Sequence, residues 1–515
     1  TLMMSADSLG VGNNSACDGI AAPLKEGTTK SHRDDTIRAG GFLCDQDIVS
    51  HRVSQATRQV DLLERWGVIF RRDADGIPLV RKASGHTLPR LAGAGDSMVR
   101  DTQQVLEEQC MKHGVVRRGD QVPLQLVHSG DQVHGIVTLD MTTGSVNGLQ
   151  AKSVIIADGG YEGIWTGSKV GLGLDLAMSA GLAVRDMEFI AWAPLAVSGT
   201  NVVLPIGLLA DGATIHHSNG NPIEVDLTAD TTALATAIGA TSDAVLDARN
   251  MGESSVWWAQ TFELVSQRLG INMKKQTVPI TPRVATTIGG IATDEHGRAV
   301  TGRWSRWFTG LYAAGDSACS GLHGAGLIAG NRLLDSMAGG AAAGEHAANH
   351  AAKTSHTGRA SLEIALGAAE ADLDFDMAAA DEGPVQRTGP LFAKLGEIMQ
   401  SSMGYSRDAQ GLENAMESLE LLADSAGKLH LDDSTRLFNT NLLEALRLKA
   451  GVRLAQATVR SAISRTESRG THQRTDYAEQ DDEQLHHTLI DIHGNLSTLA
   501  IRKGNSGTWV LSPND

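Results

Sequence analysis

The chain has few cysteines, prolines and aromatic residues. Its four cysteines, Cys17, Cys44, Cys110 and Cys319, lie far apart and form no CxxC pair. This spacing argues against a structural zinc or iron–sulfur site, and reduced thiols in a cytosolic protein are the simplest account. Twelve prolines against 57 glycines, with 41% hydrophobic residues, indicate a glycine-rich and alanine-rich α/β protein rather than a disordered one.

Long apolar runs and an excess of positive charge are also missing. No apolar run approaches the roughly 18 residues that a membrane-spanning helix needs, and we expect no secretory signal, so any membrane association must come through a partner. The net charge of −16 argues against sequence-independent nucleic-acid binding, because nucleic-acid phosphates would repel an acidic surface. A length of 515 residues predicts two or three domains.

The most informative stretch runs from Gly310 to Asp335. It begins as a short apolar strand, followed by a glycine that lets the backbone approach a ligand and by the carboxylate of Asp316. The glycine-rich run 321–330 then leads into a helix that we predict to start near Asn331. The free N–H groups and positive dipole end of such a helix suit an electron-rich ring carbonyl or a phosphate. A second strand ending in paired glycines, 154–160, offers another place for close approach.

The first five residues, TLMMS, predict a buried strand similar to the second strand of a dinucleotide-binding fold. Such a fold begins with another strand and a GxGxxG turn that meets the pyrophosphate. Because the sequence contains neither, we interpret it as an N-terminally truncated fragment, and we expect it to be unstable in isolation.

Hydrophobic periodicity divides the rest of the chain. We predict a helix over 45–66 that ends at Gly67, and a β-meander with strands at 123–128, 135–140 and 151–156. A different unit follows, with helices at 171–180 and 254–269, before the chain returns to the first domain at 279–290. Apolar residues at helical spacing predict an antiparallel bundle from four segments: 360–380, 388–403, 411–425 and 435–462.

Five segments, in order along the chain, resemble the flavoprotein subunits of succinate dehydrogenase and fumarate reductase. They are Gly12–Ala22, Ala180–Phe189, Gly289–Ile291, Phe438–Thr440 and Arg465–Glu483. Each has a plain alternative, since glycine-rich runs often serve only turns and the run 465–474 is open to reading as a solvated charged face. Their joint order favours the family.

The resemblance implies an α/β fold: a Rossmann-like FAD-binding domain with an inserted α+β capping domain and a C-terminal helical bundle. The domain limits are then 1–165 and 286–350 for the two parts of the FAD-binding domain, 166–285 for the capping domain, 351–464 for the helical domain and 465–515 for the C-terminal segment. It also implies hydride transfer through flavin N5, an iron–sulfur subunit and membrane-anchor subunits as partners, and a cytoplasmic location, peripheral at the inner face of the membrane.

By the same resemblance, a set of positions from three segments would bind FAD. The bond to FAD would be non-covalent, because the histidine that carries the flavin link in many members aligns with Gly12. The cofactor-binding positions are Ser15, Ala16, Gly19, Gly159, Gly160, Asp316, Asn331, Arg332 and Leu333.

The residues that handle a dicarboxylate in the family are replaced here. The two carboxylates of such a substrate are bound by the paired N–H donors of arginine and by histidine or threonine donors. In this family an arginine near the flavin also donates the proton. The matching positions are apolar: Ala193–Ala196, Pro205, Ile206, Ala285 and Leu327. No clear proton-donating arginine stands in 241–250, although Arg249 is close.

Three residues are the candidates for catalysis: His323, Arg283 and Arg249. His323 lies inside the glycine run and is the one we expect to reach the flavin, while Arg332, His216 and His217 lie near motif positions. For each of these the plain alternative is structural; Arg332, for example, would only pair with a nearby acid at the start of a helix. The function is therefore open between an FAD-dependent oxidoreductase, a flavoenzyme with a different substrate, and a non-catalytic paralogue that serves as a structural or assembly subunit.

Overall fold

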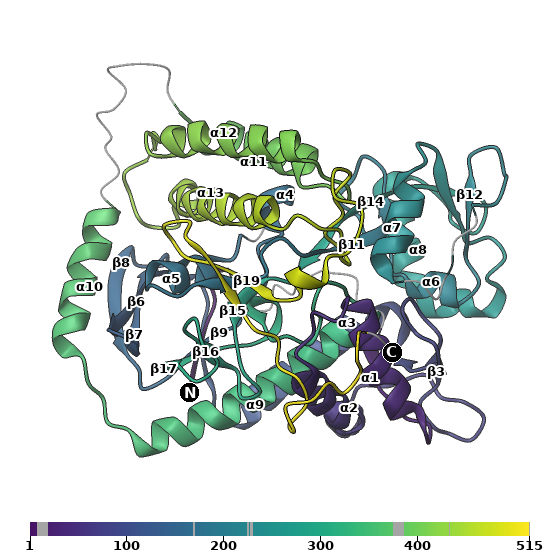
Figure 1. The fold of residues 1–515 in the computed structure, drawn as a ribbon, viewed down its shortest axis with the longest axis horizontal. Helices are drawn as coiled ribbons and strands as arrows, with labels where there is room; N and C mark the ends of the chain where they lie inside the picture. Colours follow the sequence, from purple (N-terminus) through teal and green to yellow (C-terminus); the bar gives the residue numbers. More distant parts are fainter. Residues whose placement is uncertain are drawn as a thin grey trace.

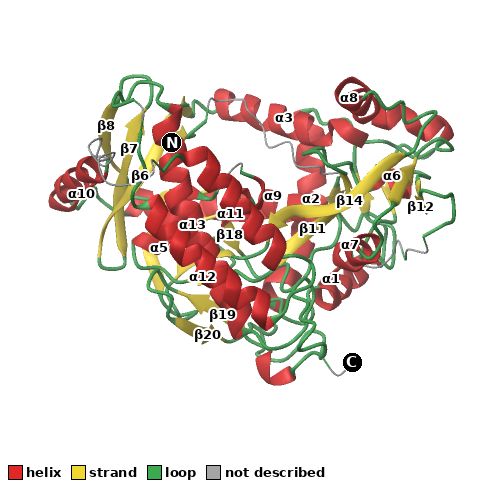
Figure 2. Cartoon of the chain, turned by 90° about the horizontal axis from the view of Figure 1, so that it is seen from above, coloured by secondary structure: helices red, strands yellow, loops and turns green. Residues whose placement is uncertain are grey.

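The computed structural model describes residues 1–7, 19–167, 170–223, 226, 230–373, 386–431 and 433–513. Figure 1 shows the helices α11 (Thr388–Ser402), α12 (Ala409–Ala426) and α13 (Thr440–Ser464) above the central sheets. The region of α7 (Thr231–Gly239), α8 (Ala259–Leu269) and β12 (Thr214–His217) is on the right. Helix α10 (Arg359–Asp372) is on the left with the strands β6 (Gln121–Ser129), β7 (Gln132–Asp140) and β8 (Ser145–Gln150). When the molecule is turned by 90°, the same bundle helices lie in the middle, between the part with α10 and β6–β8 and the part with α7, α8 and β12 (Figure 2).

A mixed sheet forms the core of the first domain. Strand β17 (Trp307–Ala313) pairs in parallel with β9 (Val154–Ile156) and antiparallel with β16 (Arg298–Val300). The meander joins it through β6 (Gln121–Ser129), β7 (Gln132–Asp140) and β8 (Ser145–Gln150). The predicted third strand, 151–156, is therefore wrong in detail. Strand β8 ends the meander, and 154–156 pairs with β17 instead.

The first residues do form a strand, but it is not buried. Strand β1 (Leu2–Met4) pairs in parallel with β5 (Val116–Arg118), and Leu2 is 37% exposed. Because apolar residues alone suggested burial, the sequence could not distinguish a strand at the surface from one inside the sheet.

Helices and short strands cover the first domain. They are α1 (Thr28–Ala39), α2 (Gln46–Trp66), α3 (Met98–Lys112), α9 (Asn331–Lys353), β2 (Ile20–Ala21), β3 (Val80–Arg81) and β4 (Leu91–Ala92). Helix α2 ends as predicted: Gly67 has φ 118°, a left-handed conformation that glycine adopts without strain, and its N–H reaches back to the last turn. Helices α2 and α9 pack together.

The inserted unit has a sheet and a hydrophobic core of its own. Its strands lie in the order β11 (Ile190–Val197), β14 (Val278–Thr287), β13 (Ala244–Asp247), β12 (Thr214–His217). Helices α6 (Gly207–Ala210), α7 (Thr231–Gly239) and α8 (Ala259–Leu269) accompany it. The predicted α+β character of this unit is confirmed.

A five-stranded sheet joins segments that are far apart in sequence. Its order is β18 (Ala318–Cys319), β15 (Gly290–Ala292), β10 (Val184–Arg185), β19 (His487–Ile490), β20 (Leu496–Leu499). The chain leaves the first domain at β10 and returns at β15, so this sheet connects the base of the inserted unit to the C-terminal segment.

Three of the four predicted helical segments form the bundle: α11 (Thr388–Ser402), α12 (Ala409–Ala426) and α13 (Thr440–Ser464). Short helices α4 (Gly163–Thr166) and α5 (Leu172–Ser179) pack against it, and Trp165 donates its Nε1–H to the Met399 carbonyl at 3.0 Å. Helix α10 (Arg359–Asp372) instead covers the β6–β7–β8 meander, a placement that its periodicity could not reveal. The predicted continuation to residue 380 lies outside the described residues.

Candidate cofactor site

A small pocket lies where the strand β17, the strand β14 and the start of helix α9 meet. Its volume is about 10 Å³, roughly the room that one water molecule needs. Its lining comes from three of the segments that the sequence singled out: Thr287, Ile288, Gly315, Asp316, Ala318, His323, Arg332, Asp335 and Ser336. The return strand, the glycine-rich run and the helix start thus meet at one place.

An ion pair between Asp316 and Arg332 dominates this pocket. The Arg332 Nε–H donates to Asp316 Oδ1 at 3.0 Å and to Oδ2 at 2.8 Å, and Nη2 also contacts Oδ2. The two side chains are only 14% and 18% exposed. Burial alone would raise the pKa of Asp316, but the charge and hydrogen bonds of Arg332 outweigh that effect and hold the pKa below its ordinary value. Asp316 is therefore a carboxylate.

His323 lies beside a second acid in the same pocket. Its Nε2 is 3.7 Å from Asp335 Oδ2, and this carboxylate also accepts from Ser320 Oγ at 2.6 Å and from Arg52 Nε at 3.2 Å. Burial lowers the pKa of His323, so the ring is neutral at pH 7. Within the described part of the chain its Nδ1 is buried without a hydrogen-bond partner.

Asn331 and Leu333 position the helix start instead of lining the pocket. Asn331 is 1% exposed; its Oδ1 lies 2.7 Å from His32 Nε2, and its Nδ2 donates to Thr36 Oγ1 at 3.0 Å. Leu333 packs on the apolar cluster between α2 and α9. Their predicted role in cofactor binding stays a prediction. The contacts made here fix where the N-terminus of α9 lies.

The paired glycines after β9 leave room for close approach. Gly159 has φ 97°, donates its N–H to Ser317 Oγ at 3.0 Å, and has open space where a Cβ would stand. A Cβ on Gly160 would lie 2.4 Å from Thr287 Oγ1, so that position requires glycine for packing. Gly19 precedes β2, whereas Ser15, Ala16 and Gly12 lie outside the described residues.

Two of the three catalytic candidates lie away from this pocket. Arg249 pairs with Asp247, with Nη2 2.7 Å from Oδ2, and its side chain is 49% exposed. Arg283 donates to the Thr200 carbonyl at 2.9 Å and contacts Asn201. Of the three, the structure places His323 alone among the pocket-lining residues. The catalytic role of each stays a prediction.

The positions without the expected dicarboxylate contacts are packed by apolar neighbours. Ala193 is 7% exposed and Leu195 is fully buried. Leu327 packs against a cluster that includes Phe189 and Ile288. Its carbonyl accepts from Thr231 Oγ1 at 3.3 Å, which brings helix α7 of the inserted unit against the glycine-rich run. These positions offer no charge to a diacid.

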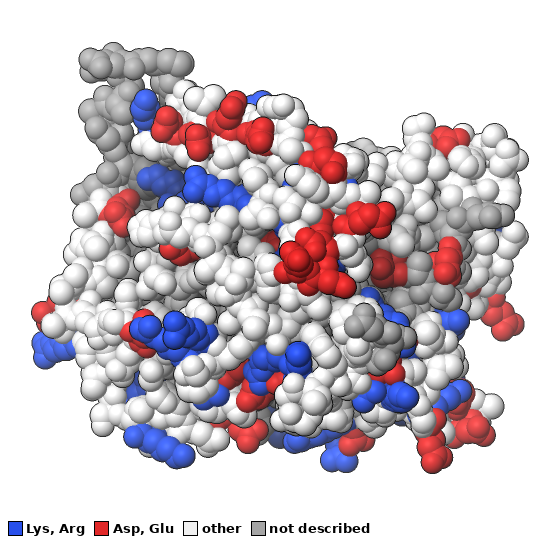
Figure 3. Space-filling view, viewed as in Figure 1, with Lys and Arg blue, Asp and Glu red and all other residues white. Residues whose placement is uncertain are grey.

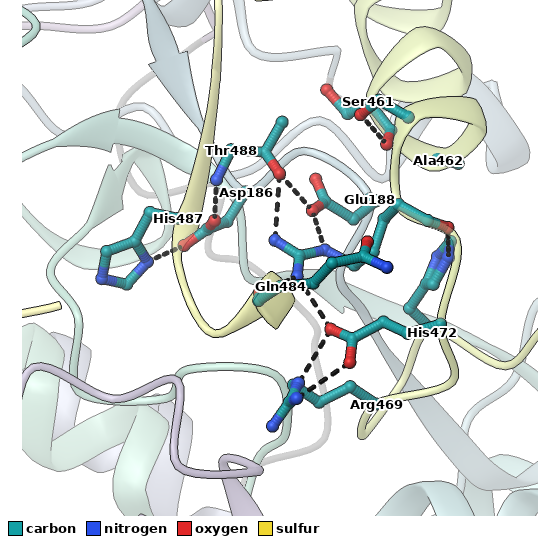
Figure 4. A network of polar contacts seen from close by, with 12 residues as sticks. Asp186, Glu188, Ser461, Ala462, Arg469, His472, Gln484, His487 and Thr488 are labelled. Atoms are coloured by element: carbon teal, nitrogen blue, oxygen red, sulfur yellow. Dashed lines mark hydrogen bonds and ion pairs between the residues drawn. The ribbon is translucent and has the colours of Figure 1, made fainter. Parts of the chain in front are cut away.

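The C-terminal charged run is not a solvated face. Arg465, Arg469, His472 and Arg474 are all at most 4% exposed, and Glu467 is fully buried. A carboxylate meets each of the first two arginines: Glu188 Oε1 lies 2.7 Å from Arg465 Nε, and Glu467 Oε2 lies 2.8 Å from Arg469 Nη2. Figure 4 shows these contacts converging from separate segments. Alternation of charge along a sequence could not show that Glu188, far away in the chain, is a partner of Arg465.

The same network continues to His487, which sequence reasoning missed. His487 Nδ1 lies 2.6 Å from Asp186 Oδ2, and its Nε2 lies 3.3 Å from Asp45 Oδ1 (Figure 4 shows the first contact). Burial would lower the pKa of His487, but the charges of Asp186 and Asp45 together raise it. Arg185 Nη1 also contacts Asp45 at 3.0 Å. This buried network ties the first domain, the base of the inserted unit and the C-terminal segment.

Neither a candidate metal site nor a membrane-spanning helix lies within the described ranges. No group of three or more histidine, cysteine, aspartate or glutamate residues there could hold a metal ion. Among those same residues, no helix has the length and apolar character to cross a bilayer.

The fold and the pocket define an FAD-binding flavoprotein of the α/β class. The profile of the FAD binding domain family matches residues 12–333, and that of the fumarate reductase flavoprotein C-terminal family matches residues 392–509. The chain belongs to the succinate dehydrogenase and fumarate reductase flavoprotein family. The family and the fold class predicted from the sequence are confirmed.

Curated relatives support this membership over most of their length. The fumarate reductase flavoprotein subunit of Mycobacterium tuberculosis is 30% identical, with 89% of this chain and 84% of the relative covered. The corresponding subunit of Haemophilus influenzae is 29% identical, with 93% and 85% covered. The succinate dehydrogenase flavoprotein subunit of Coxiella burnetii is also 29% identical, with 94% and 88% covered.

Solved structures share the whole architecture. A variant of the Escherichia coli quinol fumarate reductase flavoprotein, FrdA, superposes with a TM-score of 0.89 at 25% identity, covering 99% of this chain and 92% of that one. A quinol–fumarate reductase with menaquinol gives a TM-score of 0.87, also at 25% identity. A succinate dehydrogenase of Mycobacterium smegmatis, Sdh1, at 23% identity and a TM-score of 0.81, supports the fold alone.

The described residues suit FAD. The open backbone at Gly159 permits close approach of a ring or chain, and the pocket combines a carboxylate, a guanidinium and the start of a 23-residue helix. The carboxylate can accept hydrogen bonds from ribityl or ribose hydroxyls. The guanidinium and the N–H groups at the helix start can donate to electron-rich carbonyl or phosphate oxygens. FAD binding therefore follows from the family and from the chemistry of the pocket together.

Proposed function

We propose that this chain is the FAD-carrying subunit of an electron-transfer complex of the succinate dehydrogenase and fumarate reductase type, and that it holds FAD without a covalent link. The observation that carries the proposal is the meeting of Asp316, Arg332 and the Gly159–Gly160 turn at the carboxyl ends of β17 and β9. Ligands of open α/β sheets bind at this end of the strands. Gly12, at the position of the linking histidine, supports non-covalent binding.

Bound FAD supplies two-electron hydride chemistry at its N5 atom and one-electron transfer onward. The chain's own part is to orient and shield the ring. Gly159 and Gly160 admit it, Asp316 accepts from hydroxyl groups, and Arg332 with the start of α9 meets the electron-rich side. Leu327 and Ile288 keep water away from the apolar side.

The substrate we propose is not a dicarboxylate. Ala193, Leu195, Ala285 and Leu327 replace every group that would bind two carboxylates, and Arg249 and Arg283 are engaged elsewhere in the inserted unit. Burying an unpaired carboxylate in such surroundings costs several kcal/mol. A smaller or less charged substrate fits these positions better.

For the partners we propose an iron–sulfur subunit, reached through the C-terminal segment, with membrane-anchor subunits beyond it, so that the chain is peripheral at the inner face of the membrane. The curated relatives are named as flavoprotein subunits, which supports assembly into a complex. Figure 3 shows acidic side chains over α12 and over the segment after α13 on this face. Glu479, Asp482 and Glu483 are exposed in that segment and suit a basic docking surface.

A second candidate is a non-catalytic subunit that retains the fold for assembly. The loss of polar groups at 193–196, 205–206, 285 and 327 is the observation that favours it. It would need no redox-active flavin.

One experiment separates these readings. The purified chain is titrated with FAD and the visible spectrum is recorded. Stoichiometric, acid-extractable flavin supports non-covalent binding, and flavin that stays with the denatured protein would refute it. Reduction of the bound flavin is then tested with succinate and with its uncharged diamide or diester, which carry the same saturated C–C unit without the two charges. Rapid reduction by succinate would show that the apolar positions do not exclude a diacid. If the chain binds no flavin, the proposal of an FAD-carrying subunit fails and the non-catalytic assembly subunit is the candidate that stands.

A further inference from the structure

We propose that Arg332 is the cation that sets the affinity and the reduction potential of the flavin in this pocket, and that Asp316 is a positioning residue that holds its guanidinium there. This inference rests on the proposed function, because it needs FAD in the pocket. It goes further by assigning the tuning of the cofactor to one side chain of this chain.

The position of Arg332 is the first argument. It is the second residue of helix α9, so its side chain and the positive end of a 23-residue helix act at the same place. Both Arg332 and Asp316 line the pocket. The pair is 18% and 14% exposed, so solvent screens its field less than that of a surface pair.

The geometry of the pair is the second argument. Asp316 accepts from both Nε and Nη2 of Arg332, an arrangement that fixes the plane of the guanidinium. Lysine cannot reproduce this fork, because its ammonium is a point charge on a flexible stem. Asp316 also lies beside the Gly159–Gly160 turn, because a Cβ built on Gly160 would be 3.6 Å from the Cβ of Asp316. The ion pair therefore holds the Arg332 guanidinium close to this turn.

The charge balance of the pocket is the third argument. Asp335 is paired with Arg52, and His323 is a neutral ring, so neither adds net charge. Asp316 offsets the charge of Arg332, so the positive end of helix α9 makes the pocket electropositive only while Arg332 balances this carboxylate. A ring that gains negative charge on reduction is stabilised by such a field, which raises its potential.

The test uses the full chain reconstituted with FAD and three pocket variants: Arg332→Gln, Arg332→Lys and Asp316→Asn. The matched control is Arg453→Gln. Arg453 makes the same two-bond contact with Asp175, at 2.7 and 2.6 Å, but joins α13 to α5 outside the pocket. The measurements are the FAD dissociation constant, the midpoint potential against a reference dye, and the dissociation constant of sulfite, which adds to flavin N5 and places negative charge on the ring.

Arg332→Gln should weaken FAD binding by roughly ten- to a hundredfold, the worth of one charge-assisted hydrogen-bonding group. It should also weaken sulfite binding and lower the potential. Arg332→Lys should recover part of the sulfite affinity but less of the FAD affinity. Asp316→Asn should weaken FAD binding, because the guanidinium is no longer held in place, but it should not lower the potential, because it removes a negative charge from the pocket. Arg453→Gln should leave all three quantities unchanged.

Wild-type values for FAD affinity, sulfite affinity and potential in Arg332→Gln would overturn the inference while leaving the proposed function intact. Equal losses in Arg332→Gln and Arg453→Gln would also overturn it, because they would reflect stability alone. If the wild-type chain binds no FAD, the proposed function and this inference fail together, and the titration without variants already reveals that case.

Discussion

Replacing Glu467 by glutamine should destabilise the chain strongly, although the side chain keeps its size. Glu467 is fully buried and accepts four hydrogen bonds: from Arg465 Nη1 at 2.9 Å, from Arg469 Nε and Nη2 at 2.8 Å each, and from the Asp481 N–H at 2.8 Å. Arg465 keeps a second carboxylate in Glu188, but the carboxylate that meets Arg469 is Glu467. The variant therefore leaves a buried guanidinium without its counter-charge.

Breaking a buried ion pair on one side costs about 3–5 kcal/mol. The glutamine amide adds to this loss, because its NH₂ group is a donor and would face the N–H donors that the Glu467 carboxylate accepts from. An exposed glutamate on helix α12, Glu413, is the matched control, since Glu413→Gln should change the free energy of unfolding by at most about 0.5 kcal/mol. The assay is urea denaturation followed by tryptophan fluorescence.

Trypsin provides a local readout of the same change. Arg465, Arg469 and Arg474 are at most 4% exposed and should resist cleavage in the wild type. Arg469 Nη1 also donates to the Gly41 carbonyl at 2.6 Å, so losing its position frees the C-terminal segment from the first domain. In Glu467→Gln we expect cleavage at these arginines, detected by mass spectrometry. A variant as stable and as resistant as Glu413→Gln would refute the reasoning.

Two further predictions concern pH and packing. The folded pKa of His487 is raised, so its contribution to stability is complete below the unfolded value of about 6.5 and is lost as pH rises through the folded pKa. The difference in unfolding free energy between the wild type and His487→Gln should therefore be larger at about pH 6 than at about pH 9, and an equal difference at both would contradict this. Leu395 is fully buried in the bundle, so Leu395→Ala should cost about 2–5 kcal/mol, whereas Leu421→Ala, at a position 70% exposed, should be nearly neutral in the same urea assay.

Local patterns predicted the helices well and the strands less well. The end of α2 at Gly67 and the limits of α11 and α12 follow from apolar spacing and glycine, which act over one or two turns. Strand β8 was missed because the polar residues Asn147 and Gln150 interrupt its pattern, and its pairing with β7 decides the structure there.

The pocket was predictable in part. The glycine runs and Asp316 pointed to it, because close backbone approach and a carboxylate after a strand are visible in the sequence. The ion pair with Arg332 was one of two readings that the sequence left open. That Arg249 and Arg283 lie elsewhere depended on the turn after β13, where Arg249 pairs with Asp247, and on the side-chain direction in β14, where Arg283 donates to the Thr200 carbonyl.

The sequence by itself determined the family, and it predicts the order of the domains and the loss of dicarboxylate contacts, because these depend on which residue types stand at ordered positions. Only the tertiary structure decided which charged side chains are buried and which residues are their ion-pair partners. Arg465 and Arg469 look like a solvated run in the sequence, and Asp45, Asp186, Glu188 and His487 look unrelated. Folding brings them together in the interior, where each charge must find a partner because water is excluded.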